Sequence, residues 1–479
     1  MGAHTSQKIS GKEAITAVVF VAVLGAAFLP TIVYPYLLTD ELWVIRLDTP
    51  YWALGFGRPM FGAISWIAGK LFLWEGLEAI YWMRASAIVA LALSAILLAR
   101  WLEKWGTASI SARLLALATM TLPAFQIIVA DGTPLAFGVL MAMIAPFLAL
   151  AGFQATGLAR VRCYLGSAVL VQGALIVYQQ TALMAFAVLI VPVLSSGSSR
   201  FRFAWAQGLI IAIATLVYFI VWRTAYRIVA PDRMDTRYGP DAVQIPSLEH
   251  LVTTLELRFI QVAELWSVDL PALSVISGGA AALIMLKLVT EICADIRRGL
   301  MTTLFVVGLF VAADGIALAA GAYPSYVTAP AISLIVLYAA FAGASVVMRE
   351  YAFLIPCILV IVGVVSAHIT LREIAIPNWR HMVQIREAIL ANPEALNFHV
   401  LGDKNNSSFY QEFSWMNART DVYLHMAAVH VAEDLARAGA IPKDRFTRLH
   451  FSVGRVLVFS EPAGEHANQR PGSVTVELD

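Results

Sequence analysis

Long apolar stretches separated by short polar segments fill the first 370 residues of the chain. A helix that crosses the hydrocarbon layer of a membrane needs about 20 mainly apolar residues, because no water there can hydrogen-bond an exposed backbone. The pattern predicts roughly eleven such helices. They cover residues 15–38, 82–99, 112–130, 134–152, 164–178, 181–194, 204–229, 271–291, 300–320, 326–347 and 351–370.

Three segments need separate interpretation. The fifth and sixth predicted spans are short and are joined tightly at Tyr178-Gln179-Gln180. The first run exceeds the roughly 7–15 apolar residues of a signal peptide and further spans follow it, so it is predicted to be an uncleaved helix. The apolar stretch Met60–Trp74 carries Lys70 and is predicted to lie at the membrane interface.

Composition supports a membrane location. Hydrophobic residues make up 59% of the 479 residues, charged residues only 14%, and the mean hydropathy is +0.75. A soluble domain carries about a quarter charged residues, so the apolar excess must face lipid. The expected fold class is an all-α polytopic membrane protein with a small C-terminal α/β domain. The net charge of +1 gives no support for nucleic-acid binding.

Basic residues in short loops predict the orientation of the spans, because Lys and Arg are enriched in cytoplasmic loops. Six clusters fall in alternate loops, so residues 1–14 are predicted to be cytoplasmic. The loops at 39–81, 131–133, 230–270 and 321–325 are then predicted to face outward. The six clusters are Lys8 and Lys12; Arg100, Lys104 and Arg113; Arg160 and Arg162; Arg200 and Arg202; Arg297 and Arg298; and Arg349.

Residues 371–479 are more polar and are predicted to form an extracytoplasmic α/β domain beyond the membrane region 15–370. His399-Val400-Leu401 and Phe451–Phe459 are predicted strands, and Val422–Arg437 an amphipathic helix. The tail after Pro462 is predicted to be loose.

The loop 39–81 holds the most informative polar residues. Asp40 and Glu41 follow the first predicted span directly, and Arg58 lies in Gly57-Arg58-Pro59. A carboxylate at headgroup depth could take a proton from an acceptor hydroxyl, and an arginine could pair with a lipid-linked phosphate. Acidic and aromatic residues also mark helix ends, and that interpretation is equally compatible with the pattern.

Other polar residues carry two interpretations each. Asp131 stands in a short outer turn, either as a turn residue or in the same site. Tyr178 and Gln179 either line a cavity or hold helices together. Arg84 either contacts phosphate or reaches the headgroups. Asp314 lies inside an apolar span and must face protein or water.

Several motifs are missing. The sequence contains no GxxxxGK[ST] phosphate loop, no HExxH, no GxSxG elbow and no paired CxxC, and its three cysteines are far apart. Nucleotide hydrolysis and a zinc site are therefore not expected. The sequence indicates no metal site and leaves open whether a divalent metal ion binds.

These residues, taken in order, resemble the GtrII-type glucosyltransferases, within the GT-C class of membrane glycosyltransferases. The resemblance rests on the acidic pair after the first span, Gly57-Arg58-Pro59, Asp131 in the second outer turn and Tyr178-Gln179 in a later loop. It covers residues 15–370.

The resemblance implies roles for these residues. Asp40 or Glu41 would be the catalytic base, and Arg58 would help hold the donor phosphate. Asp131, Tyr178 and Gln179 would shape the sugar or acceptor pocket. One departure concerns a late Arg-Tyr pair of the class, where Ser325 precedes Tyr326 here. Phosphate binding by that stretch is therefore in doubt, and Arg58 or Arg84 would carry more of it.

The resemblance also implies the setting. The donor would be a polyprenyl-phosphate sugar, usually undecaprenyl phosphate, and the product an O-antigen of lipopolysaccharide bearing an added hexose such as glucose, with inversion. The enzyme would lie in the bacterial inner membrane, with its C-terminal domain periplasmic, and would depend on a flippase and a donor synthase. The alternatives are a flippase for lipid-linked glycans, and a polymerase or ligase that uses the loop 230–270.

The predicted topology can be tested by thiol labelling in a background without native cysteines. Asp40→Cys and Glu41→Cys are expected to react with a membrane-impermeant reagent added to cells with a permeable outer membrane. Arg297→Cys is expected to react only after the inner membrane is opened. Protection of positions 40 and 41 until that step would contradict the orientation.

Overall fold

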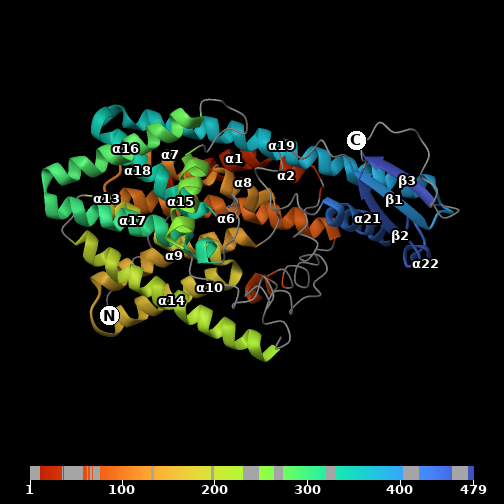
Figure 1. The fold of residues 1–479 in the computed structure, drawn as a ribbon, viewed down its shortest axis with the longest axis horizontal. Coiled ribbons are helices and arrows are strands. Elements are labelled where there is room, and N and C mark those ends of the chain that lie inside the picture. Colours follow the sequence, from red (N-terminus) through yellow and green to blue (C-terminus); the bar gives the residue numbers. More distant parts are fainter. Residues whose placement is uncertain are drawn as a thin grey trace.

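The computed structural model describes residues 11–34, 36, 58–61, 63–64, 67, 76–130, 134–195, 199–229, 247–263, 273–319, 329–402, 420–455 and 473–478. The molecule is elongated, with a helical bundle at one end and a small α/β domain at the other (Figure 1). Each predicted span contains helix. The first half of the bundle comprises α1 (Gly11–Phe28), α2 (Pro30–Val33), α6 (Gly76–Lys104), α7 (Ser109–Met120), α8 (Pro123–Ala130), α9 (Leu135–Gln154) and α10 (Gly157–Val177).

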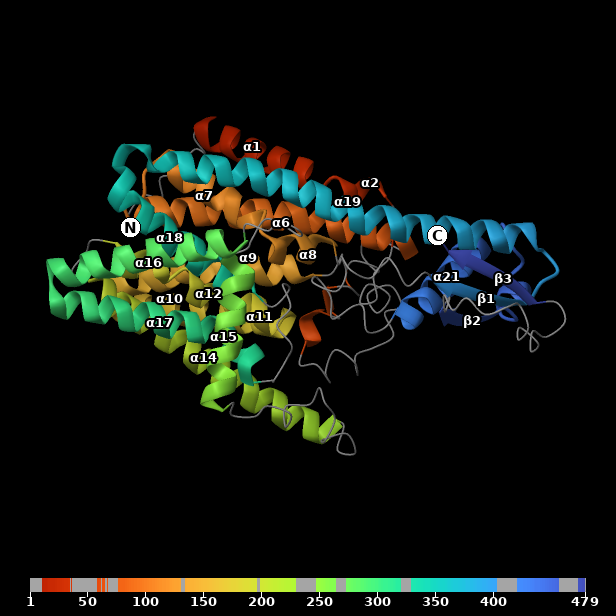
Figure 2. The same ribbon diagram turned by 45° about the horizontal axis from the view of Figure 1, so that its top comes forward.

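The second half of the bundle follows a break at Tyr178. It ends in a helix that leaves the bundle and enters the C-terminal domain (Figure 2). Its elements are α11 (Gln179–Ala182), α12 (Met184–Ala187), α13 (Ile190–Leu194), α14 (Arg200–Val229), α15 (Leu248–Ala263), α16 (Leu273–Ala294), α17 (Ile296–Ala319), α18 (Pro330–Met348), the 3-10 helix η4 (Arg349–Phe353) and α19 (Leu354–Ala391).

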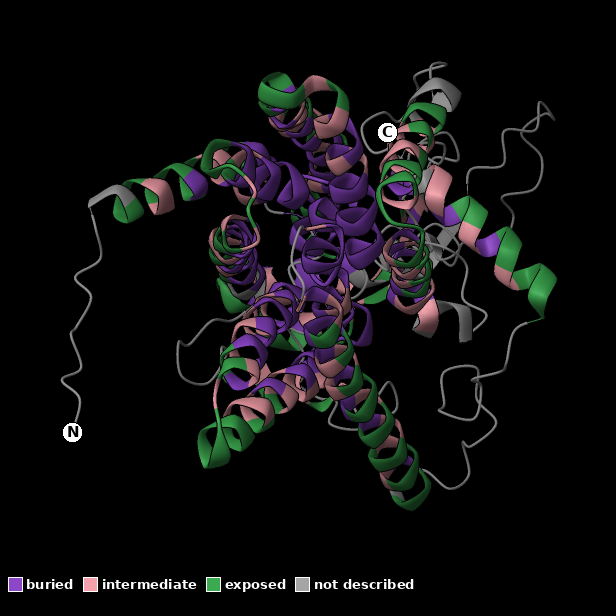
Figure 3. Ribbon diagram, turned by 90° about the vertical axis from the view of Figure 1, so that its left-hand side faces the viewer, coloured by how far each residue is buried: buried purple, intermediate pink, exposed green. Residues whose placement is uncertain are grey.

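The bundle has the surface of a membrane protein. Among the described residues, seven helical stretches are long and apolar enough to cross a bilayer, or up to eight if the bent pair α7–α8 counts as one span. Buried residues gather at the centre of the bundle, and exposed ones lie on its outward faces (Figure 3). Large apolar side chains such as Val18, Leu165 and Leu304 are among the exposed ones. The predicted polytopic helical class is confirmed.

Several predicted spans are not straight single helices. Residues 112–130 divide into α7 and α8, which meet at an angle of 54°. Thr121 and Leu122 precede Pro123, and a proline disfavours helical backbone in the residue before it. The pair predicted over 164–194 consists of one long helix, α10, and three short buried ones, α11 to α13.

Part of the segment predicted to be an outer loop, 230–270, is helical, and its side of the membrane stays a prediction. Residues Leu248–Ala263 form α15, which packs against α16, α17 and α18. This helix alternates buried and exposed positions, with Thr254 and Arg258 buried and Val252 and Leu257 exposed. Its Arg258 is paired with Asp314 inside the bundle, which a hydropathy pattern cannot reveal.

The C-terminal domain is a small parallel sheet with helices against it. Strand order is β2-β1-β3, so β1 is central and pairs in parallel with both neighbours. The buried Phe398 and Val400 of β1 pack with α21, with the end of α19 and with Ile80 of α6. The elements are β1 (Asn397–Gly402), α21 (Thr420–Arg437), α22 (Lys443–Phe446), β2 (His450–Arg455) and β3 (Ser473–Leu478).

Two expectations about this domain change. Residues 473–478, predicted to be loose, form β3, whose Val476 is buried. Helix α19 continues without a break across residue 370, so the predicted domain boundary at 371 falls inside a helix. The predicted strand at 399–401 and helix at 422–437 are confirmed, and β2 confirms the described part of the third element.

Helices α16 and α18 approach closely at Gly343. A Cβ atom added to Gly343 would overlap the backbone of Leu283, so only glycine fits at this crossing. Small residues at such contacts let membrane helices approach each other and gain dispersion contacts. Gly343 therefore fixes the position of α18 relative to α16.

We expect Gly343→Ala to destabilise the bundle by about 1–3 kcal/mol, because the added methyl group must displace the Leu283 backbone. The measurement is thermal unfolding of the purified protein in detergent. Gly308→Ala on α17 is the matched control, since nothing lies near its added Cβ atom. Equal melting temperatures for the two variants would contradict a tight crossing.

Candidate functional site

A chain of polar contacts joins Arg58 to the break between α10 and α11. Arg58 Nε donates to Gln179 Oε1 at 3.2 Å, and the guanidinium lies over the Tyr178 ring at 4.3 Å from its centroid. Gln179 Nε2 in turn donates to the Tyr218 hydroxyl of α14 at 2.7 Å. Three of the residues predicted to belong to the site are thus neighbours.

The break itself explains how polar side chains come to lie inside the bundle. Tyr178 has extended backbone angles (φ −162°, ψ 121°), so α10 ends and α11 begins anew at Gln179. The side chains of Tyr178 and Gln179 are largely buried. Because lipid offers no hydrogen bonds, each polar group here needs a partner from another segment. Arg58 and Tyr218 supply those partners.

A buried ion pair lies beside this chain of contacts. Arg258 Nε of α15 is 3.2 Å from Asp314 Oδ2 of α17, and neither side chain is exposed. Tyr178 lies within electrostatic range of the Arg258 guanidinium. Asp314 Oδ1 accepts no hydrogen bond from any described residue. The charge predicted to face protein or water is therefore paired with a cation.

Arg258 was not predicted from the sequence. Its signal is indirect: a lone carboxylate in an apolar span requires a buried cation somewhere else in the chain. Arg258 lies 56 residues before Asp314 in a segment that resembles an outer loop. Nothing in the local pattern selects it over the other arginines of that segment.

Arg84 ties three chain segments together. Its guanidinium donates to the backbone oxygens of Thr31 (3.3 Å), Tyr36 (3.1 Å) and Ala130 (3.2 Å), and lies 3.6 Å from the centroid of the Tyr36 ring. The Tyr36 hydroxyl also donates to Ala130 O at 3.1 Å. We call this arrangement the Arg84 clasp. These contacts are structural, and a phosphate-binding role for Arg84 stays a prediction.

The predicted site residues other than Arg84 fall into two groups. Arg58, Tyr178 and Gln179 come together as described. Asp40, Glu41, Asp131 and Tyr326 lie outside the described residues. The Arg84 clasp nevertheless includes Ala130, the residue before Asp131, and Tyr36, four residues before Asp40.

The described part of the site is cationic. It contains the guanidinium groups of Arg58 and Arg258 and one carboxylate, that of Asp314. Such a balance suits an anionic ligand held in a region of low dielectric constant. Among the described residues, no three His, Cys, Asp or Glu side chains are grouped closely enough to hold a metal ion.

Comparison with models of protein families and with curated proteins found no match. Among solved structures, the chain is similar to the crystal structure of ArnT from Cupriavidus metallidurans in the apo state, with a TM-score of 0.47 and 13% identity. The alignment covers 92% of this chain and 90% of that one.

Arg258→Met is expected to destabilise the protein by about 3–5 kcal/mol, because it leaves the Asp314 carboxylate buried without its cation. The double variant Arg258→Met/Asp314→Leu removes both charges and is expected to recover most of that loss. The free energy of unfolding in detergent is measured for both single variants, Arg258→Met and Asp314→Leu, and for the double variant. Additive losses in the double variant would contradict the pairing.

Proposed function

We propose that the chain is an integral membrane glycosyltransferase that transfers a sugar from a polyprenyl-phosphate donor to an acceptor outside the cytoplasm. The observation that carries the proposal is the Arg58 guanidinium, oriented by Gln179 and by the Tyr178 ring. A planar guanidinium presents paired N–H donors whose geometry matches the oxygens of a phosphate group.

The depth of this cluster agrees with a lipid-linked donor. Tyr218 and Arg200 are 18 residues apart on α14, which corresponds to about 27 Å at the helical rise of 1.5 Å per residue. The hydrocarbon core of a bilayer is about 30 Å thick. If Arg200 marks one boundary, the Arg58–Gln179–Tyr218 contacts lie near the other, at the level of a phosphate headgroup.

The Arg84 clasp supports a single site for the predicted acids. It joins Tyr36 to Ala130, and the chain reaches Asp40 four residues after Tyr36 and Asp131 one residue after Ala130. Four extended residues span at most about 14 Å. Both acidic segments therefore start from one point of the bundle, within reach of a shared substrate.

The proposed reaction is a displacement at the anomeric carbon of the donor sugar. An acceptor hydroxyl attacks this carbon, the bond from the carbon to the phosphate oxygen breaks, and the prenyl phosphate leaves with the electron pair. Asp40 or Glu41 takes the hydroxyl proton, and Arg58 stabilises the negative charge that grows on the phosphate. A single displacement of this kind inverts the configuration.

Finer details extend the proposal. We infer glucose as the sugar and an O-antigen as the acceptor, with Asp131 and Gln179 contacting the sugar and Tyr326 near the donor phosphate. We place the N-terminus in the cytoplasm of a bacterium and the C-terminal domain in the periplasm, where it would contact the acceptor. A flippase and a polyprenyl-phosphate sugar synthase would supply the donor.

Asp40→Asn and Glu41→Gln identify the base. One of them, or the double variant if the acids share the role, is expected to lower transfer about 10²–10⁴-fold, the usual contribution of general base catalysis. The assay follows transfer of sugar from polyprenyl-phosphate glucose by purified protein, with mass spectrometry of the product. One added sugar indicates a transferase, whereas a chain of repeats indicates a polymerase.

Glu78→Gln is the matched control, since Glu78 is an exposed acid that accepts a hydrogen bond from Trp82 near the start of α6. It is expected to keep full activity. Wild-type rates in both single variants and in the double variant would rule out the acids as the base.

A further inference from the structure

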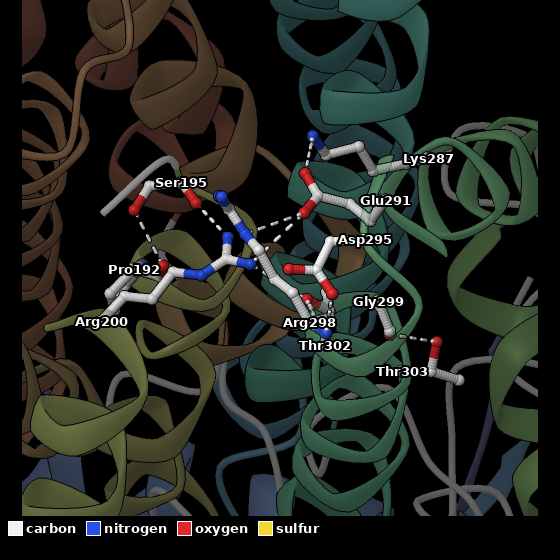
Figure 4. A network of polar contacts seen from close by, with 10 residues as sticks. All are labelled: Pro192, Ser195, Arg200, Lys287, Glu291, Asp295, Arg298, Gly299, Thr302 and Thr303. Carbon is white, nitrogen blue, oxygen red and sulfur yellow. Dashed lines mark hydrogen bonds and ion pairs between the residues drawn. The ribbon is translucent and has the colours of Figure 1, made fainter. Parts of the chain in front are cut away.

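A second cationic cluster lies at the end of the bundle opposite the C-terminal domain, where α14 begins and where α16 meets α17 (Figure 2). One carboxylate, Glu291 of α16, is shared by three cations. Lys287 Nζ is 2.8 Å from Glu291 Oε1, and Arg200 and Arg298 are 3.3 Å and 3.6 Å from Oε2 (Figure 4). A second carboxylate, that of Asp295, accepts the backbone N–H of Arg298 at 3.1 Å, so three positive charges face two negative ones.

The buried member of the cluster has an unused donor. The Arg200 side chain is 0% exposed; its terminal nitrogens donate to Ser195 O, Glu291 and Thr302 Oγ1. Its Nε has no acceptor among the described residues. A buried guanidinium normally satisfies all its donors, so the described cluster lacks one hydrogen-bond acceptor for Arg200. Arg298 is 41% exposed and opens the cluster to a ligand from outside.

An aromatic surface continues from the cluster along α14 and α17. Arg298, Thr302 and Phe305 share one face of α17, at spacings of four and three residues. Phe305 stacks with Phe201 at 5.3 Å and meets Trp205 edge-on at 5.4 Å between ring centroids. Trp205 is 65% exposed. Tryptophan is enriched at membrane interfaces, so this surface lies where acyl chains meet headgroups.

We propose that this cluster binds the phosphate of an anionic phospholipid, whose acyl chain lies against Phe305 and Trp205. Basic pockets between membrane helices take up such headgroups. The excess of positive charge, the unused Arg200 donor and the neighbouring aromatic surface each favour this ligand. The site is about 27 Å along α14 from Tyr218, so it is separate from the proposed transfer site and does not depend on it.

The test titrates short-chain phosphatidylglycerol into the purified full-length protein and follows its melting temperature. A ligand that binds only the folded state raises this temperature. We expect phosphatidylglycerol to stabilise the wild type, and phosphatidylcholine and inorganic phosphate to have no such effect. Lys287→Gln/Arg298→Gln is expected to weaken the lipid's apparent affinity roughly 30-fold, as two lost cationic contacts predict.

The matched control is Arg160→Gln/Arg162→Gln, which removes the same charge from exposed positions at the start of α10. It is expected to keep the wild-type affinity. If the cluster double variant does not fold, Arg298→Gln alone is expected to weaken binding roughly fivefold. Equal losses in the two double variants, an unchanged affinity in the cluster variants, or the same stabilisation by inorganic phosphate would overturn the proposal.

Discussion

Polar groups inside the bundle depend on the protein for hydrogen-bond partners, because lipid supplies no donor or acceptor. This constraint explains the described contacts of Arg84, Gln179 and Arg258. Arg84 satisfies three backbone oxygens near helix ends, where carbonyl groups lack intrahelical partners. Gln179 and Arg258 each reach a side chain on another helix. Breaks in the spans are tolerated because side chains distant in the sequence form hydrogen bonds with the groups exposed at each break.

The same constraint separates the roles of the arginines. Those that hold backbone oxygens or a single carboxylate, such as Arg84 and Arg258, are part of the architecture. Arg58 is held by a neutral amide and an aromatic ring. Its planar donors, held at the break between α10 and α11, make it the candidate for a phosphate. All three arginines lie near predicted site residues, so proximity alone would not separate their roles.

Much of the helical architecture can be predicted from hydropathy. The span expected at 134–152 is α9 at Leu135–Gln154, because an apolar run of bilayer length has no other stable structure in lipid. Hydropathy does not predict where a helix ends if the helix continues beyond the membrane. After residue 370 the sequence becomes polar while α19 continues, since its later turns pack on the C-terminal domain through Met382 and Ile389.

Long-range pairing explains the remaining differences. The strand Ser473–Leu478 alternates apolar and polar residues, yet it is stable only beside β1, about 70 residues earlier. Arg258 likewise depends on Asp314, and neither local pattern contains its partner. The grouping of Arg58 with Tyr178 and Gln179 was anticipated from their order in loops on one predicted face. Their contact geometry, and the involvement of Tyr218, required the fold.

Helix α19 has 38 residues and therefore extends about 57 Å, nearly twice the length that a bilayer requires. It is a continuous helical connection between the bundle and the sheet (Figure 1). Each residue inserted into α19 would rotate the sheet about the helix axis by about 100° and move it about 1.5 Å further from the bundle. The number of residues in this one helix thus fixes the orientation of the C-terminal domain and its distance from the bundle. Among related chains, change in this domain should accumulate in its loops rather than in the length of α19.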